Sequence, residues 1–246
     1  MKNVNSLIGN KFRKTAIFIL LLLLPIFSFA LLSKKHNKPG LEYWHGNNNE
    51  KKVALTFDDG PNDVYTRQIL DILKQNDVRA TFFMIGKNVE RYPEVAREVA
   101  ESGEVIGNHS YTHRNLIFDI NPFVRKQITR TQNVIFDNTG IVTNLFRPPF
   151  GGDDPFTLHQ TKKLGYVIVK WSVSSKDWEK PGVNKIVNNV LKGVQDGAII
   201  LMHDGDELRR NIDRSQTVEA LPIIISELRK QGYEFVTVPE LLGLNK

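Results

Sequence analysis

The chain has 246 residues, with 33 Lys and Arg against 27 Asp and Glu and a formal net charge of +6. Six of the basic residues precede His36 and no acidic residue does, so the remaining 27 basic residues balance the 27 acidic ones. The basic excess therefore belongs to the N-terminal segment, which removes the usual electrostatic argument for nucleic-acid binding. Cysteine is absent, which excludes disulfides, thiolate metal sites and a cysteine nucleophile.

An apolar run at residues 15–32 follows Lys11, Arg13 and Lys14 and precedes Lys34 and Lys35. At about 1.5 Å per residue this run is roughly 27 Å long as a helix, close to the thickness of a bilayer core. The basic flank on its N-terminal side predicts a single-pass cell-membrane anchor with the rest of the chain outside. Residues 28–30 also resemble a cleavage site, so a form secreted after cleavage behind Ala30 is the alternative.

The remainder divides into a polar linker and a folded domain. We predict a cytoplasmic tail and anchor at residues 1–35, a linker at 36–50 with Pro-Gly and an Asn run, and one domain at 51–246. Apolar runs predict strands at 53–57, 80–85, 105–107, 145–147, 166–170, 198–202 and 234–238. Helical periodicity lies between most of them, near 65–73, 93–101, 121–137, 156–164, 184–192 and 217–231. This alternation predicts an α/β fold, a distorted (β/α) barrel of about seven parallel strands.

Polar clusters come directly after four of the predicted strands. In a β/α barrel the C-terminal ends of the strands face one shared cleft, where chemistry collects. The clusters should therefore meet. They are Thr56–Gly60 (TFDDG), His109–His113 (HSYTH), Arg147–Gly151 (RPPFG) and Leu201–Asp204 (LMHD).

Two of these clusters have the donor types of a metal site. His109 and His113, with one carboxylate, match a His₂-carboxylate zinc site that keeps positions open for water and substrate. The adjacent acids Asp58 and Asp59 repel each other unless a cation or a shared proton relieves them. One of them can bind the metal while the other stays free as a base. A turn with a capping Asp before Gly60 is the structural alternative.

Arg147 and His203 complete the candidate chemistry. Two prolines follow Arg147 and stiffen its backbone, so its guanidinium can pair with the free carboxylate; a surface ion pair is the alternative. His203 follows an apolar strand, where it is either a buried structural histidine or a general acid that protonates a leaving amine.

The region from Lys51 to about Leu242 resembles the NodB-like polysaccharide deacetylases of carbohydrate esterase family 4. The motifs that carry the resemblance occur in the family's order. They are TFDDG at 56–60, HSYTH at 109–113, RPPFG at 147–151, KDW at 176–178 and LMH at 201–203. The resemblance implies a distorted (β/α) barrel, a hydrolase of amide bonds, and a divalent metal, zinc first with Co²⁺, Ni²⁺ or Mn²⁺ as alternatives.

The same resemblance implies roles for individual residues. Asp58 would be the catalytic base, with Arg147 positioning it, and His203 the general acid. The metal ligands would be Asp59, His109 and His113. The substrate-binding residues would be Phe150, whose backbone N–H helps to stabilise the oxyanion, and Trp178, Leu201 and Asp177.

One position departs from the family pattern. The fourth motif commonly reads Asp-x-x-Asp-Trp, and its first Asp tunes the catalytic histidine, whereas Ser174 stands there in this chain. A hydroxyl can hydrogen-bond an imidazole but cannot stabilise imidazolium with a full charge. We therefore expect His203 to be less basic here than in typical members.

The leading function is removal of N-acetyl groups from N-acetylglucosamine units of cell-wall peptidoglycan, because the domain is predicted to lie outside the membrane on a short linker. The enzymatic alternatives are a deacetylase of N-acetylmuramic acid or of chitooligosaccharides, and an O-acetyl polysaccharide esterase, because pocket loops decide among these substrates. The other alternative is a wall-binding module with degenerate activity. The predicted partners are the polysaccharide and, through residues 15–32, the membrane; we expect a monomer and no nucleic acid.

Overall fold

The computed structural model describes residues 41–117, 121–152 and 154–244. The predicted membrane anchor at residues 15–32 and the alternative cleavage site behind Ala30 lie outside the described residues. Within the described ranges, no helix combines the length and the apolar character needed to cross a membrane.

Nine strands form one sheet in this part of the chain, and every pair of named strands runs parallel. The order of the strands is β1-β6-β5-β4-β3-β2-β8-β7, with β9 beside β2. The strands are β1 (Glu42–Tyr43), β2 (Lys52–Asp58), β3 (Thr81–Met84), β4 (Val105–Asn108), β5 (Leu145–Phe146), β6 (Val167–Val169), β7 (Val173–Ser174), β8 (Ala198–His203) and β9 (Glu234–Phe235).

The connection from β6 to β7 shows that the sheet is curled. These two strands lie near opposite ends of the strand order, yet only residues 170–172 separate them in the sequence. A link of this length reaches roughly 14 Å at full extension, far less than the width of a flat sheet of this many strands. The sheet must therefore bend back on itself, as expected of a distorted β/α barrel.

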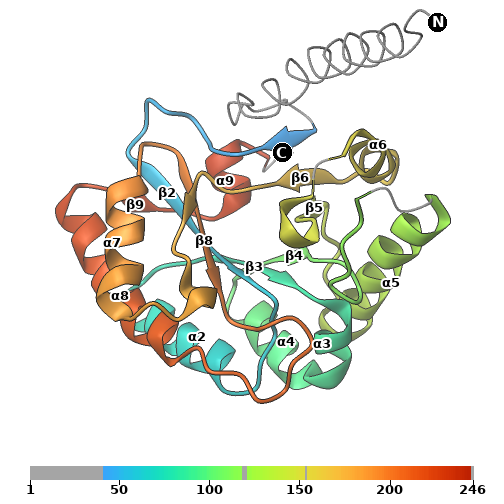
Figure 1. Cartoon of the computed structure of the whole chain (residues 1–246), viewed down its shortest axis with the longest axis horizontal. Helices are drawn as coiled ribbons and strands as arrows, with labels where there is room; N and C mark the ends of the chain where they lie inside the picture. The colour runs from blue at the N-terminus through green and yellow to red at the C-terminus, as the bar shows by residue number, and fades with distance from the viewer. Residues whose placement is uncertain (1–40, 118–120, 153, 245–246) are drawn as a thin grey trace, which may run out of the picture. The chain divides into compact units, whose positions relative to one another are not determined.

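Most of the helices cover the outer face of this curled sheet (Figure 1). The longer helices lie where the sequence shows helical periodicity, and α4 begins with Pro93 in its first turn, a position that tolerates the missing N–H. The helices are α2 (Tyr65–Gln75), α3 (Gly86–Arg91), α4 (Pro93–Glu101), α5 (Asn121–Thr139), α6 (Pro155–Lys163), α7 (Val183–Gly193), α8 (Ser215–Lys230) and α9 (Val238–Leu242), with short 3₁₀ turns η1 (Pro149–Gly151) and η2 (Asp177–Glu179).

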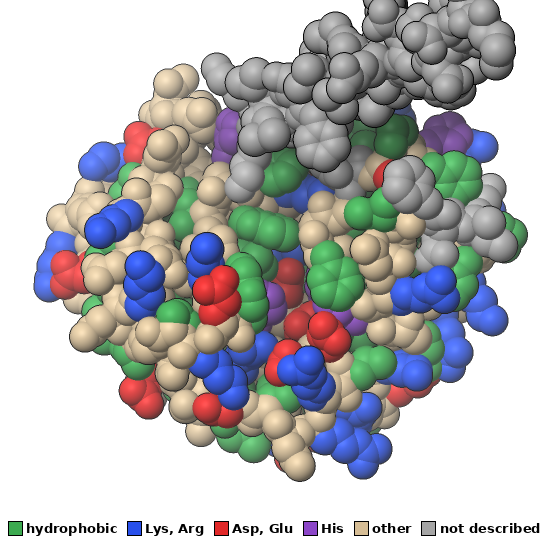
Figure 2. All heavy atoms as spheres, in the orientation of Figure 1, with side chains coloured by type: hydrophobic (Ala, Val, Ile, Leu, Met, Phe, Trp, Pro, Cys, Tyr) green, Lys and Arg blue, Asp and Glu red, His purple; other side chains and the backbone are tan. Residues whose placement is uncertain are grey.

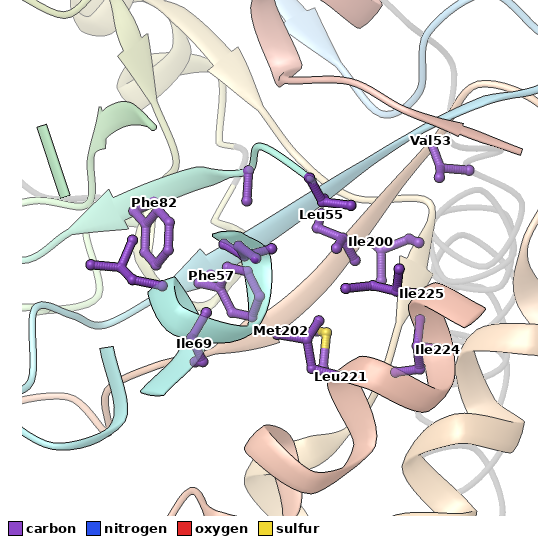
Figure 3. Packing of buried hydrophobic residues seen from close by; sticks show 14 of the residues in the cluster. Val53, Leu55, Phe57, Ile69, Phe82, Ile200, Met202, Leu221, Ile224 and Ile225 are labelled. Carbon is purple, nitrogen blue, oxygen red and sulfur yellow. The ribbon is translucent and has the colours of Figure 1, made fainter. Parts of the chain in front are cut away.

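Alternation along β2 separates the core from the site. Successive side chains of a strand point to opposite faces. Val53, Leu55 and Phe57 therefore pack outward against residues of α2 and α8, in the cluster drawn in Figure 3. Thr56 and Asp58 point to the inner face of the sheet, where both contact a buried arginine described below. The apolar side chains on the outer face hold the strand in the core. The polar side chains on the inner face lie near the C-terminal edge of the sheet.

The structure differs from the predicted elements at several places. The predicted linker at 36–50 contains a short strand, because Glu42 and Tyr43 pair in parallel with β6 and the Glu42 side chain is buried. The strand β7 and the helices α3 and α9 were not predicted, and α9 begins at Val238, where the predicted last strand ended. Elements of two to six residues are too short to show a hydrophobic period.

Candidate metal centre and active site

The loops that follow β2, β4, β5 and β8 meet at one cleft of about 540 Å³. Figure 2 shows acidic and histidine side chains gathered near the centre of this face, with hydrophobic side chains beside them. The cleft is lined by Asp58, Asp59, His109, His113, Pro148, Phe150, Gly151, Trp171, Trp178, Lys180, Leu201, His203, Asp206, Glu207, Arg209 and Arg214.

Asp59, His109 and His113 form a group whose potential ligand atoms all lie within 4.8 Å of one another. The Oδ1 atom of Asp59 is 3.1 Å from Nε2 of His113 and 3.5 Å from Nε2 of His109. All three residues are buried. The sequence expectation that these three side chains, distant in the chain, lie around one point agrees with this geometry.

Neighbouring groups orient the three side chains toward that point. The Nδ1–H of His109 donates to the carbonyl oxygen of Arg147 at 2.6 Å, which leaves Nε2 with a lone pair for a cation. The backbone N–H of Glu207 donates to Oδ2 of Asp59 at 3.0 Å. Among the described residues no hydrogen bond reaches Oδ1 of Asp59 or Nδ1 of His113, although both atoms are buried.

The protonation states also suit a cation. Burial lowers the pKa of His113 to about 4, against the opposing pull of the Asp59 carboxylate, so this imidazole is neutral near pH 7. Burial would raise the pKa of Asp59, but His109 and His113 hold it well below its usual range. One ionised carboxylate oxygen without a hydrogen bond, beside two imidazole nitrogens, is a donor set that fits a divalent metal such as zinc.

Asp58 lies beside this group and is held by Arg147. The Nη1 atom of Arg147 donates to Oδ1 of Asp58 at 2.7 Å, and the arginine is completely buried. Its remaining donors bind the carbonyl oxygens of Val169 and Lys170, each at 3.0 Å, and the hydroxyl of Thr56 at 2.8 Å. Because this pair is buried, the alternative of a surface ion pair is excluded. The other carboxylate oxygen of Asp58, Oδ2, lies 3.8 Å from Nε2 of His109.

His203 enters the cleft at the end of β8 and is paired with Asp177. Its Nδ1 lies 2.8 Å from Oδ1 of Asp177, and its backbone N–H donates to Oδ2 at 2.8 Å. Burial works against the charged imidazolium, but the Asp177 carboxylate outweighs it and raises the pKa of His203 to about 9. Because Nδ1 is occupied, Nε2 is the nitrogen that remains for a substrate.

Asp177, expected to bind substrate, does not line the cleft: it is buried, and its Oδ2 also accepts a hydrogen bond from Thr217 at 2.8 Å. We expected Ser174 to leave His203 less basic than in typical members of the family. In the structure, Asp177 supplies His203 with a carboxylate partner. The signal was present in the sequence, since Asp177 belongs to the KDW motif.

The remaining predicted residues form the walls of the cleft. Phe150 and Trp178 are 62% and 42% exposed, so both offer an aromatic face to a ligand, whereas Leu201 is buried at 3%. The ammonium of Lys170, at the end of β6, donates to the carbonyl oxygens of Gly151 and Gly152. This lysine, which the sequence did not single out, fixes the loop that carries Phe150.

The comparisons with known proteins agree with this geometry. The family model for polysaccharide deacetylase matches residues 45–169. A peptidoglycan-N-acetylglucosamine deacetylase of Bacillus cereus is 42% identical over 225 residues, which cover 86% of this chain and 98% of that protein. The crystal structure of the Bc1960 peptidoglycan N-acetylglucosamine deacetylase has a TM-score of 0.76 and 38% identity, covering 82% of this chain and 93% of that one.

A third similar structure is a carbohydrate esterase family 4 pseudoenzyme from Bacillus anthracis, with a TM-score of 0.76, 30% identity, and coverage of 83% of this chain and 69% of that one. This likeness shows that the fold alone does not decide activity, which depends on the residues of the site. Both the family model and the level of identity identify the family: the chain belongs to the polysaccharide deacetylases.

Proposed function

We propose that this protein is a metal-dependent deacetylase that removes N-acetyl groups from N-acetylglucosamine units of peptidoglycan. The observation that carries the proposal is that one cleft holds a candidate base, a candidate metal site and a candidate acid on different strands. A buried carboxylate, Asp58, stands beside three metal-ligand side chains, and a histidine with its own carboxylate partner, His203, enters the same cleft from another strand.

Asp58 is suited to accept a proton. Arg147 engages its Oδ1 and holds the carboxylate in place, while Oδ2 faces the side of the metal ligands. In the proposed reaction Asp58 takes the proton of a water molecule as that water adds to the acetyl carbonyl carbon. Asp59, His109 and His113 would hold a divalent cation, which would supply Lewis acidity at the carbonyl and lower the pKa of water to about 7.

His203 is suited to give a proton. With a pKa of about 9 it carries a proton on Nε2 at neutral pH, and the carboxylate of Asp177 stabilises the charge. In the second step Nε2 donates this proton to the amide nitrogen as the C–N bond breaks. The products are acetic acid, which ionises to acetate, and a sugar with a free amine; Asp58 then releases its proton to solvent and His203 takes one up.

The sugar-binding part of the proposal rests on the cleft walls and the relatives. Exposed aromatic faces at Phe150 and Trp178 suit the apolar face of a pyranose ring, and Leu201 offers an apolar contact for the acetyl methyl group. The B. cereus relative and the Bc1960 structure are both named for action on peptidoglycan N-acetylglucosamine. Zinc is the proposed metal, because it prefers two imidazoles and a carboxylate with open positions.

We further propose that the catalytic domain acts outside the cell membrane as a monomer. The support for the location is the apolar run at residues 15–32 with its basic flank. Protease treatment of intact cells tests this placement: the domain should be degraded while a cytoplasmic control protein survives.

Acetate release from purified peptidoglycan tests the reaction. The full-length chain should release acetate, lose this activity with a chelator, and regain it with added Zn²⁺. Mass spectrometry of the digested glycan should then show loss of one acetyl group from N-acetylglucosamine. Loss from muramic acid, or activity on chitooligosaccharides alone, would reassign the substrate. Bound metal without acetate from any glycan would favour a wall-binding module.

A further inference from the structure

We propose that Asn88 is a positioning residue that fixes the metal ligand Asp59 through two hydrogen bonds to backbone carbonyls. Asn88 lies on α3, the short helix after β3, and it does not line the cleft. The inference rests on the metal-dependent function proposed above, but it concerns the geometry of the ligands rather than the identity of the sugar.

The helix α3 contacts both segments that carry the metal ligands. The backbone N–H groups of Gly86 and Lys87 donate to the carbonyl oxygens of Ser110 and Tyr111, each at 3.0 Å. These two acceptors lie between His109 and His113 in the sequence. The residue before α3, Ile85, donates to the carbonyl oxygen of Gly60 at 2.9 Å, directly after Asp59. The helix therefore links the histidine loop to the acidic loop.

Asn88 adds a third segment to this link. Its amide nitrogen donates to the carbonyl oxygen of Asp59 at 2.7 Å and to that of Glu207, on the loop after β8, at 2.8 Å. The N–H of Glu207 in turn donates to Oδ2 of Asp59 at 3.0 Å. These three hydrogen bonds close a ring that fixes both the backbone and the carboxylate of Asp59, and so leaves Oδ1 to face the two histidines.

The surroundings define the direction of the Asn88 amide. Arg91, one turn later, donates from Nη1 to Oδ1 of Asn88 at 3.2 Å, which places the amide nitrogen toward the two carbonyls. Arg91 also donates to the carbonyl oxygen of Leu208 at 3.2 Å, on the same loop. Every polar atom of the Asn88 side chain is therefore used, as expected for a residue that is 4% exposed.

The two carbonyls that Asn88 binds belong to residues in an unusual backbone conformation. Asp59 and Glu207 have φ values of 75° and 51°, in the left-handed region that non-glycine residues seldom adopt. Such conformations persist only where surrounding contacts hold them. Close packing also requires glycine at 205, since a Cβ atom there would lie 2.2 Å from the carbonyl oxygen of Asp59. The two hydrogen bonds from Asn88 hold the Asp59 and Glu207 carbonyl groups in this close packing.

The test is metal affinity, measured by titration of the metal-free, full-length chain with Co²⁺ and by competition for Zn²⁺ with a chelating dye. Asn88→Leu keeps a similar volume but removes both donors, and Asn88→Asp places a carboxylate against two carbonyls. We expect either change to weaken metal binding about 10- to 100-fold, the range found when groups that orient metal ligands are lost.

Asn138→Leu is the matched control. Asn138 donates to a carbonyl oxygen, that of Val134 at 2.8 Å, within α5, and no hydrogen bond found among the described residues joins its side chain to a metal ligand. We expect metal affinity within twofold of wild type for this variant. Equal affinity for wild type and both Asn88 variants would overturn the proposal, as would an equal loss of affinity in Asn138→Leu.

A second variant covers the case in which the Asn88 variants fail to fold. Arg91→Ala removes the group that orients the Asn88 amide and leaves both carbonyl contacts possible, so a loss of a few-fold in metal affinity is expected; unchanged affinity would count against the proposal. Metal affinity is independent of deacetylation. A wild-type chain that binds metal tightly but releases no acetate would contradict the proposed function and leave the role of Asn88 intact.

Discussion

Two of the three histidines that line the cleft, His113 and His203, lie in opposite electrostatic environments. His113 faces Asp59 at 3.1 Å, no residue in the described part of the chain hydrogen-bonds its Nδ1 atom, and burial lowers its pKa to about 4. The side chain of His203 is 13% exposed against 7% for His113, and Asp177 engages its Nδ1 at 2.8 Å, so its pKa rises to about 9. The imidazole of His113 is thus neutral on one wall of the cleft, whereas that of His203 is cationic on another.

This difference separates two kinds of chemistry. A neutral imidazole has a lone pair for a metal, whereas a protonated one can act as an acid at neutral pH. Pairs of titratable groups with pKa values pushed apart in this way are typical of sites that use an acid and a base together. We therefore assign metal binding and base catalysis to one wall and proton donation to the other.

Asp58→Asn should produce the largest effect, because it removes the base from the metal-binding wall. The amide can still accept a hydrogen bond from Arg147, so the fold and the metal ligands are preserved. We expect kcat/KM for acetate release to fall about 10²- to 10⁴-fold, the usual contribution of general acid–base catalysis. Acetate assays and metal analysis of the same preparation check this. Full activity in the variant, or loss of the metal, would contradict the assignment of Asp58.

Asp177→Asn should have a smaller effect that depends on pH, because it acts on the other wall. His203 must be protonated to act as the acid, so activity should fall as pH rises through its pKa of about 9. Without the carboxylate, this pKa should move toward the ordinary value near 6.5. The alkaline limb of the kcat profile should then shift to lower pH, with about a tenfold loss at pH 7.5. If the alkaline limb did not shift, Asp177 would not be the group that raises the pKa of His203.

The pH dependence of stability should distinguish the two histidines in the metal-free protein. The pKa of His203 is raised on folding, so its contribution is complete below pH 6.5 and is lost as pH rises to about 9. The pKa of His113 is lowered, so its contribution is complete above pH 6.5 and is lost as pH falls to about 4. Each slope is at most about 1.4 kcal/mol per pH unit.

Denaturant unfolding of two variants measures these slopes. His203→Gln should flatten the dependence between pH 6.5 and 9 and leave the acidic side unchanged. His113→Gln should flatten the dependence between pH 4 and 6.5 and leave the alkaline side unchanged. If both variants changed the stability in the same way over the whole pH range, the two histidines would not differ in their titration as proposed.

Much of the fold and of the site follows from local sequence patterns. The apolar runs predicted most strands, since a buried parallel strand such as β8 is nearly all hydrophobic. The polar clusters after the strands predicted the metal group, because the C-terminal ends of parallel strands share one edge. These inferences need only the residues near each strand end.

The missed features depend on contacts between distant residues. The pair of Asp177 and His203 forms across 26 positions, and the link from Asn88 to Glu207 spans 119. Composition and hydrophobic period do not identify Asp177 or Asn88, although Asp177 belongs to the KDW motif. Asn88 had one positional signal, since it lies shortly after the end of β3, at the same edge as the other clusters.

Ser174→Asp should have the smallest effect, and it tests whether His203 already has all the carboxylate support that it needs. The sequence led us to expect that an acid at 174 would raise the basicity of His203. In the structure, Asp177 occupies Nδ1 and the backbone N–H of His203 and also binds Thr217, so His203 offers no further donor on that side. The alkaline limb of the kcat profile should therefore move by less than about 0.5 pH unit, whereas Asp177→Asn moves it substantially. A large upward shift in Ser174→Asp would mean that a second carboxylate reaches the imidazolium, and that Asp177 alone does not set its pKa.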